Sequence, residues 1–143
     1  MKRFKEQSLM KLSIDKWIRR LGMPLIYTDD GKLCFLIDTG ASYNVLLREA
    51  YERYKSSFTK LGKDDFLLGM VGDPQKIFMV AGEISFGGVS YNGEFGVLEG
   101  TDAMNNVKIL TGLQIDGAIG VEFLTKYGLV LDFARNELYD LNA

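Results

Sequence analysis

The chain has 143 residues, of which 47% are hydrophobic and 25% are charged, and its formal net charge is −2. This size and apolar content predict one folded domain, and they exclude a disordered chain or a chain with two full catalytic lobes. The small net charge, with basic residues spread along the chain, gives no strong field to attract nucleic acid or anionic lipid, so we expect neither nucleic acid nor a membrane as a partner.

The first 22 residues predict an amino-terminal amphipathic helical segment that precedes the main domain. Apolar residues recur at spacings of three and four from Met10 to Leu21, and Gly22 ends the pattern. The basic face of this helix would suit a membrane surface, but the short apolar stripe favours docking on the domain or on a second subunit. Residues 4–8 are mainly polar where a signal peptide needs an apolar run, so we expect neither a signal peptide nor a membrane span.

Residues 23–143 predict one domain that is mainly β with short helices. Its first element is a hairpin, in which residues 25–27 and 33–37 flank an Asp-Asp-Gly turn at 29–31. The second run is apolar at every position, which is typical of a strand buried on both faces, and it ends at Asp38.

The remaining elements follow from spacing and from glycine. A helix is predicted after Asn44 as far as Phe58, followed by a polar connection over residues 59–65. Between residues 66 and 98, short apolar stretches alternate with glycines, which predicts several short antiparallel strands. The last part of the chain predicts a loop over residues 99–108 and a short apolar segment over residues 117–120. A short helix over residues 122–126 and a closing hairpin over residues 129–139 follow.

The composition also limits the chemistry. Without any histidine, the chain has no Ser-His or Cys-His nucleophile and lacks a common metal ligand, so an enzyme of this sequence would work through carboxylates. The single cysteine, Cys34, excludes an internal disulfide, is compatible with a reducing compartment, and lies in a predicted buried strand where we expect it to be inert. We expect a cytoplasmic protein.

Asp38 is the candidate catalytic carboxylate. A carboxylate at the end of a doubly buried strand is costly unless it has a partner or keeps its proton. Four small residues follow it, and they allow close approach of a neighbouring group while supplying hydroxyl and amide donors: Thr39, Gly40, Ala41 and Ser42.

This stretch, Leu36-Ile37-Asp38-Thr39-Gly40-Ala41-Ser42, resembles the active-site motif of aspartic peptidases of the pepsin and retropepsin type. In that family a late segment of two apolar residues and a glycine threads under the catalytic loop and leads into a short helix, and residues 118–124 are similar to it. The resemblance covers about residues 23–141 and is closest to bacterial single-lobe members. It implies a single-lobe, retropepsin-like closed β barrel.

The sequence departs from the viral members at two places. They pair an acidic residue after the motif with an arginine after the late glycine, whereas this chain has Ser42 and Val121 there, so that ion pair cannot form. The chain also has one Asp-Thr-Gly, so a second catalytic carboxylate must come from another copy.

The resemblance therefore implies an aspartic endopeptidase that hydrolyses extended peptides through a dyad of Asp38 from two subunits of a homodimer. It also implies that the enzyme needs no metal or organic cofactor. Thr39 would donate a hydrogen bond across the interface, and the amide of Gly40 would steady the carboxylate. Ala41 would contact substrate, together with a hairpin that covers the site around Met70, Val71 and Gly72, although an ordinary surface turn explains those glycines almost as well.

Two alternatives remain open. The first is a catalytically silent peptide-binding or assembly module with the same fold, because fold alone does not decide function. The second is a divalent-metal cluster of Asp116, Glu122 and Asp132, although a turn, a helix start and a hairpin explain these residues more simply.

Overall fold

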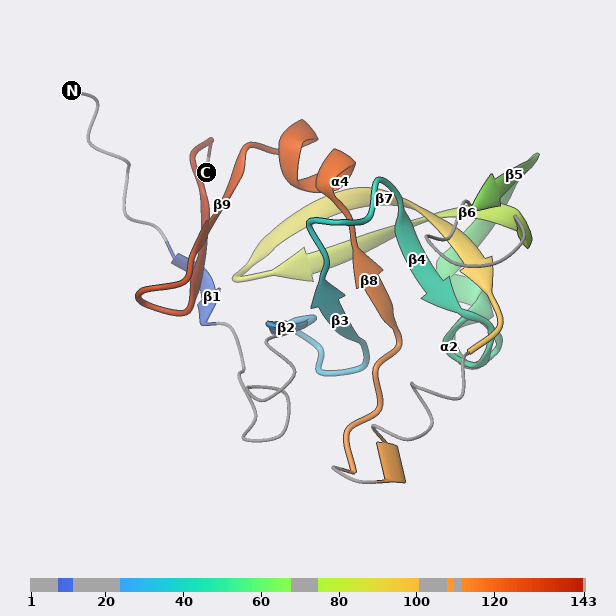
Figure 1. Cartoon of the computed structure of the whole chain (residues 1–143), viewed down its shortest axis with the longest axis horizontal. Coiled ribbons are helices and arrows are strands. Elements are labelled where there is room, and N and C mark those ends of the chain that lie inside the picture. The colour runs from blue at the N-terminus through green and yellow to red at the C-terminus, as the bar shows by residue number, and fades with distance from the viewer. Residues whose placement is uncertain (1–7, 12–23, 68–74, 101–107, 110–111, 143) are drawn as a thin grey trace.

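The computed structural model describes residues 8–11, 24–67, 75–100, 108–109 and 112–142, which form two sheets and short helices (Figure 1). A three-stranded sheet has the order β1-β10-β9, and a seven-stranded sheet has the order β2-β3-β8-β4-β7-β6-β5. The strands of the smaller sheet are β1 (Ser8–Lys11), β9 (Leu129–Asp132) and β10 (Glu137–Asp140). Those of the larger sheet are β2 (Leu25–Tyr27), β3 (Cys34–Ile37), β4 (Asn44–Leu47), β5 (Phe58–Leu67), β6 (Gln75–Phe86), β7 (Val89–Leu98) and β8 (Gly117–Ile119).

Among the described residues, short helical elements that join the strands are α2 (Arg48–Arg53), a 3-10 turn η1 (Lys55–Ser57) and α4 (Val121–Lys126). α2 follows β4 directly and buries Ala50 and Tyr51, whereas α4 begins directly after Gly120 and buries Phe123 and Leu124. The helix predicted over residues 122–126 and the closing hairpin, β9 and β10, are confirmed.

The first hairpin is confirmed, because β2 pairs with β3 in antiparallel register. Its turn is closed by the side chain of Asp30, which accepts hydrogen bonds from the Lys32 amide at 2.9 Å and from the Thr28 hydroxyl at 2.7 Å. These hydrogen bonds lower the pKa of Asp30, since they favour the charged carboxylate. Gly31 has a φ of 71°, a conformation that glycine adopts without steric cost.

The middle of the chain differs from the prediction. Residues 44–47, expected to begin a helix, form a strand between β7 and β8, and the helix that follows ends at Arg53. The expected polar connection over residues 59–65 lies inside β5. Pairing with neighbouring strands outweighs the helical spacing in this region, as tertiary contacts commonly do.

The short strands predicted between residues 66 and 98 are replaced by one long hairpin of β6 and β7. Glycines do not interrupt these strands, because the rings of Phe58 and Phe95 pack where side chains at Gly82 and Gly93 would lie. Aromatic rings also form the centre of the core, where the ring centroid of Phe95 lies 5.7 Å from that of Phe35 and 5.8 Å from that of Phe58.

The predicted closed barrel is wrong, because the larger sheet is open. In the part of the chain that the structure describes, β2 and β5 are the edge strands of this sheet, because β2 pairs with β3 alone and β5 pairs with β6 alone. Closing a barrel requires strands of matched length and stagger. Here β2 and β8 have three residues each, about 10 Å at the usual rise of a strand, whereas β6 has twelve.

The amino-terminal prediction is corrected at its start. Residues 8–11, expected to belong to the amino-terminal helical segment, form β1, which pairs with β10. The rest of the predicted helix falls on residues outside the described part, so the helix and the domain boundary stay predictions. Among the described residues, no helix has the length and apolar content needed to cross a bilayer.

Candidate active site

The site is built around β8, which lies between β3 and β4 (Figure 1). β8 pairs parallel with β3, with Ile37 opposite Ile119, and antiparallel with β4, with Val45 opposite Ala118. The connection from β3 to β4, residues 38–43, therefore passes the end of β8. This connection is the predicted catalytic loop.

The backbone of Asp38 is fixed while its side chain is exposed. Its amide donates to the carbonyl of Ile119 at 2.9 Å, and its carbonyl accepts from the amide of Ala41 at 3.1 Å. The amide of Gly40 donates to the carboxylate oxygen Oδ1 of Asp38 at 3.0 Å. The expected burial of this carboxylate is not seen in the single chain, because β3 ends at Ile37 and the loop beyond it faces solvent.

Gly120, directly after β8, lies against the second half of the loop. A Cβ atom at this position would be 2.6 Å from the carbonyl oxygen of Tyr43 and 2.8 Å from that of Ala41, so glycine is required for this close approach. The amides that follow donate to the loop, Val121 to Ala41 at 2.8 Å and Glu122 to Ser42 at 3.2 Å. Backbone hydrogen bonds thus join the two places where the viral ion pair is missing.

One residue of the site was missed from the sequence. Asn44, the first residue of β4, is buried, and its side-chain oxygen accepts a hydrogen bond from the amide of Gly120 at 2.9 Å. The sequence offered one signal, an amide side chain directly before the apolar run of residues 45–47. Because a buried amide group without a hydrogen bond is costly, such a residue is expected to bond to another part of the fold.

The structure brings together part of the predicted site. Thr39 and Gly40 are exposed beside Asp38, and Ala41 is half-buried in the same loop. The predicted cover, with Met70, Val71 and Gly72, lies outside the described residues and stays a prediction. The strands on either side of it, β5 and β6, do pair, with Leu67 opposite Gln75.

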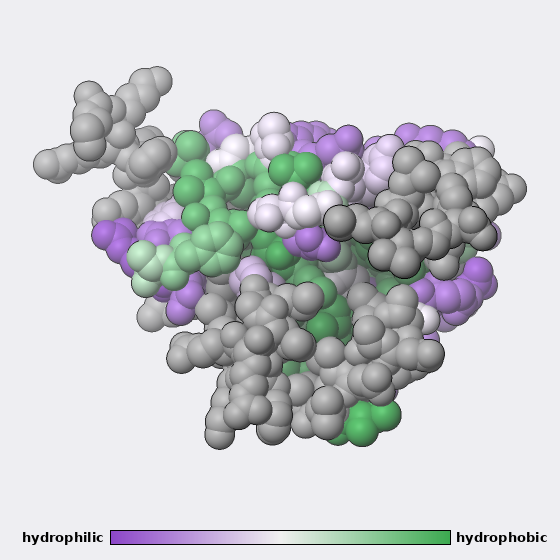
Figure 2. All heavy atoms as spheres, in the orientation of Figure 1, coloured by the Kyte–Doolittle hydropathy of each residue, from purple (hydrophilic) through white to green (hydrophobic). Residues whose placement is uncertain are grey.

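An apolar face adjoins the catalytic loop. A shallow groove runs from Thr39 along α4 to β9, and its other lining residues are Val121, Leu124, Thr125, Gly128, Leu129, Val130, Leu131 and Leu141. Phe133, in the turn after β9, is 64% exposed. Figure 2 shows apolar side chains gathered over the β9–β10 hairpin and beside α4.

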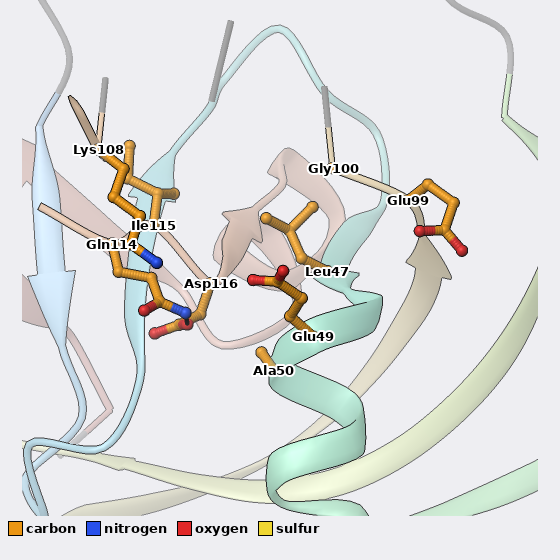
Figure 3. A pocket seen from close by; sticks show the side chains of 9 residues that line it. All are labelled: Leu47, Glu49, Ala50, Glu99, Gly100, Lys108, Gln114, Ile115 and Asp116. Carbon is orange, nitrogen blue, oxygen red and sulfur yellow. Dashed lines mark hydrogen bonds between the residues drawn. The ribbon is translucent and has the colours of Figure 1, made fainter. Parts of the chain in front are cut away.

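A separate pocket lies at the opposite end of β8 (Figure 3). Asp116 and Gln114 reach into it from the segment before β8. Leu47 lines it from the end of β4, and Glu49 lines it from the first turn of α2. Its volume of about 210 Å³ is below the ~300–1,000 Å³ of typical small-molecule sites. The Asp116 carboxylate has a structural role, because it accepts a hydrogen bond from the Cys34 amide at 2.9 Å and forms an ion pair with Arg53.

The three carboxylates considered as metal ligands lie in three separate settings. Asp116 is buried in the ion pair with Arg53, and Glu122 is exposed in the first turn of α4. Asp132 accepts hydrogen bonds from the amides of Ala134 and Arg135 in the hairpin turn, at 3.0 Å each.

Cys34 is buried in β3, and burial raises the pKa of its thiol to about 11, so formation of the reactive thiolate is suppressed.

No family model matches the chain, and no curated protein matches it. Among solved structures, it is similar to the retroviral protease-like domain of Ddi1 from Leishmania major, with a TM-score of 0.54 and 19% sequence identity. The alignment covers 78% of this chain and 80% of that domain. At this level of identity the likeness concerns the fold alone, and it shows that the chain has a mainly β, retropepsin-like fold.

Proposed function

We propose that the chain is an aspartic endopeptidase that is active as a homodimer. The observation that carries the proposal is the setting of Asp38: its backbone is held by β8, while its carboxylate is exposed and accepts a hydrogen bond from Gly40. A catalytic side chain needs a fixed position and must be accessible to the substrate, and Asp38 meets both conditions. The motif resemblance to single-lobe bacterial peptidases and the retropepsin-like fold support the same assignment.

The proposed chemistry uses two copies of Asp38 that face each other across a twofold axis. Two carboxylates this close cannot both ionise without a large penalty, so the pair holds one proton. The charged member removes a proton from a bound water, which attacks the peptide carbonyl, while the protonated member polarises that carbonyl and then passes its proton toward the leaving amine. Thr39 donates across the interface, and Gly40 keeps the carboxylate oriented. The pair works without a metal or an organic cofactor.

Two features support pairing with a second copy of the chain. One chain carries one Asp-Thr-Gly, so a dyad of this kind is incomplete without a partner. The groove next to the catalytic loop is mainly apolar and leads to β9, an edge strand of the smaller sheet as described. A twofold axis near Thr39 would place the same face of each copy at the interface, as an isologous contact requires.

The proposed substrate is an extended peptide. Ala41 would contact its backbone next to the dyad, and the segment containing Met70, Val71 and Gly72 would cover it. Excluding water in this way strengthens the electrostatic interactions on which the reaction depends.

The test compares Asp38→Asn with the parent chain. Both are incubated with a diverse peptide mixture over a range of pH, and new termini are identified by mass spectrometry. We expect cleavage to fall by at least about 100-fold in Asp38→Asn, because the variant lacks the shared proton, while folding is preserved. Glu83→Gln, which neutralises an exposed carboxylate on β6, serves as the control and should cleave like the parent.

Equal cleavage by the parent and Asp38→Asn would refute the assignment of Asp38. A parent chain that binds peptides without cutting any of them would favour the silent peptide-binding module instead.

A further inference from the structure

Asn44 stands out among the buried residues of the larger sheet. All four residues of β4 are buried, and three of them are apolar, yet the first is an amide side chain with 6% exposure. Burying an amide group is costly unless its polar atoms find partners. Its oxygen has one, the amide of Gly120 at 2.9 Å, from a residue 76 positions away along the chain.

The hydrogen bond reaches the catalytic loop through a single peptide unit. The peptide between Ile119 and Gly120 donates its N–H to the side chain of Asn44. The carbonyl of the same peptide accepts the amide of Asp38 at 2.9 Å. Because a peptide unit is planar, a group that fixes its N–H also fixes the direction of its C=O. Asn44 thereby sets the acceptor that holds the backbone of Asp38.

The position of this peptide unit leaves little room for adjustment. Gly120 is already packed against the carbonyl oxygens of Ala41 and Tyr43, and its neighbour Val121 donates to Ala41. A rotation of the peptide would therefore move the whole loop that carries Asp38. No ion pair between the places of Ser42 and Val121 is available to resist such a movement.

We propose that Asn44 is a positioning residue for catalysis, which holds the peptide between Ile119 and Gly120 so that Asp38 meets its partner's carboxylate in a productive geometry. The proposal rests on the proposed peptidase function. By one buried hydrogen bond, Asn44 provides bracing of the kind that the viral members of the resembled family obtain from an ion pair.

The test uses Asn44→Leu, which keeps the approximate volume of the side chain and removes the acceptor, and Asn44→Asp, which restores an oxygen at the same place. Asn92→Leu is the matched control, because Asn92 lines the same pocket as Asn44 but is exposed on β7. For each variant, kcat and KM for peptide cleavage are measured per folded dimer, and amide hydrogen exchange is followed at Asp38.

We expect Asn44→Leu to lower kcat by about 100-fold with little change in KM, because a displaced catalytic group weakens the reaction more than binding. Exchange at the Asp38 amide should accelerate in the same variant. Asn44→Asp should recover most of kcat and restore slow exchange at Asp38, and Asn92→Leu should behave like the parent in both measurements.

A merely structural role gives a different result. Asn44→Leu would then lower stability while kcat per folded dimer stayed at the parental value, and the proposal would be overturned. If the parent cleaves no peptide, the peptidase assignment fails by itself, and exchange decides the remaining question. Unchanged exchange at Asp38 in Asn44→Leu would show that Asn44 does not hold Asp38 at all.

Discussion

Arg53, at the end of α2, forms an ion pair with Asp116, which is buried directly before β8. The same carboxylate accepts the amide of Cys34 at the start of β3. One side chain therefore joins α2, β3 and β8 at the end of β8 that is remote from Asp38. Because the Asp116 side chain is only 5% exposed, losing one of these partners would leave a buried carboxyl group with fewer interactions.

We expect Arg53→Met to lower the free energy of unfolding by about 1 to 3 kcal/mol, since it leaves a buried carboxylate without its cation. The matched control is Arg48→Met. Arg48 also lies near an aromatic ring, but its partner Glu99 is exposed, so its loss should cost less than about 1 kcal/mol. Chemical denaturation of both variants measures the difference, and equal losses would mean that Asp116 does not need Arg53.

The close approach at Gly120 gives a second prediction. In Gly120→Ala the new methyl group would collide with two backbone carbonyl oxygens of the catalytic loop, those of Ala41 and Tyr43. Backbone atoms cannot move aside as a flexible side chain can, so we expect a loss of about 2 to 4 kcal/mol in unfolding free energy, together with loss of cleavage. Gly100→Ala is the control, because its methyl group would meet only Leu47 at 3.9 Å. A Gly120→Ala chain as stable and active as Gly100→Ala would contradict the described packing.

The thiol of Cys34 predicts a loss of stability in alkali. Folding raises its pKa from 9.0 to about 11, mainly because burial disfavours the thiolate. The folded state therefore favours the neutral thiol, and this contribution is present below pH 9 and is lost as the pH rises toward 11. The loss should reach about 1 to 3 kcal/mol relative to Cys34→Val, in which nothing titrates at this position. The unfolding free energies of both chains are measured by denaturation across this pH range, and their difference gives the contribution of the thiol. A difference that does not change with pH would show that the thiol is not desolvated.

The proposed dimer predicts that activity depends on concentration. Activity per chain should fall when the protein is diluted below its dimer dissociation constant, because a separated chain has half of the dyad. Adding excess Asp38→Asn chains should also reduce activity by trapping parental chains in heterodimers with one carboxylate. Excess Glu83→Gln chains, which keep Asp38, should cause no such loss. Sedimentation that shows a fully active monomer at every concentration would contradict the shared dyad.

Asp38 could be proposed as a candidate from the sequence because local rules apply to it: an apolar strand, a carboxylate and small residues follow one another directly. The first hairpin and the closing hairpin were predicted for the same reason, since a turn signal lies between two apolar runs. The helix predicted for the stretch from Asn44 to Leu47 was wrong, because pairing of this segment with β7 and β8 outweighs its helical spacing of apolar residues.

What could not be predicted depends on distant contacts. The roles of Asn44 and Asp116 are defined by partners 76 and 82 residues away, which a single sequence does not reveal. The open sheet was missed for a related reason. Whether the first and last strands of a sheet meet depends on strand lengths and stagger across the whole domain, and the glycines in β6 and β7 falsely indicated breaks.

The threading of β8 between β3 and β4 has a consequence for synthesis. The loop with Asp38 is made early, but the strand that holds it, and Gly120 with it, is made about 80 residues later. Contacts of such long range form only after the intervening chain is available. A chain that ends before β8 therefore carries the complete Asp-Thr-Gly motif without the strand that holds the backbone of Asp38.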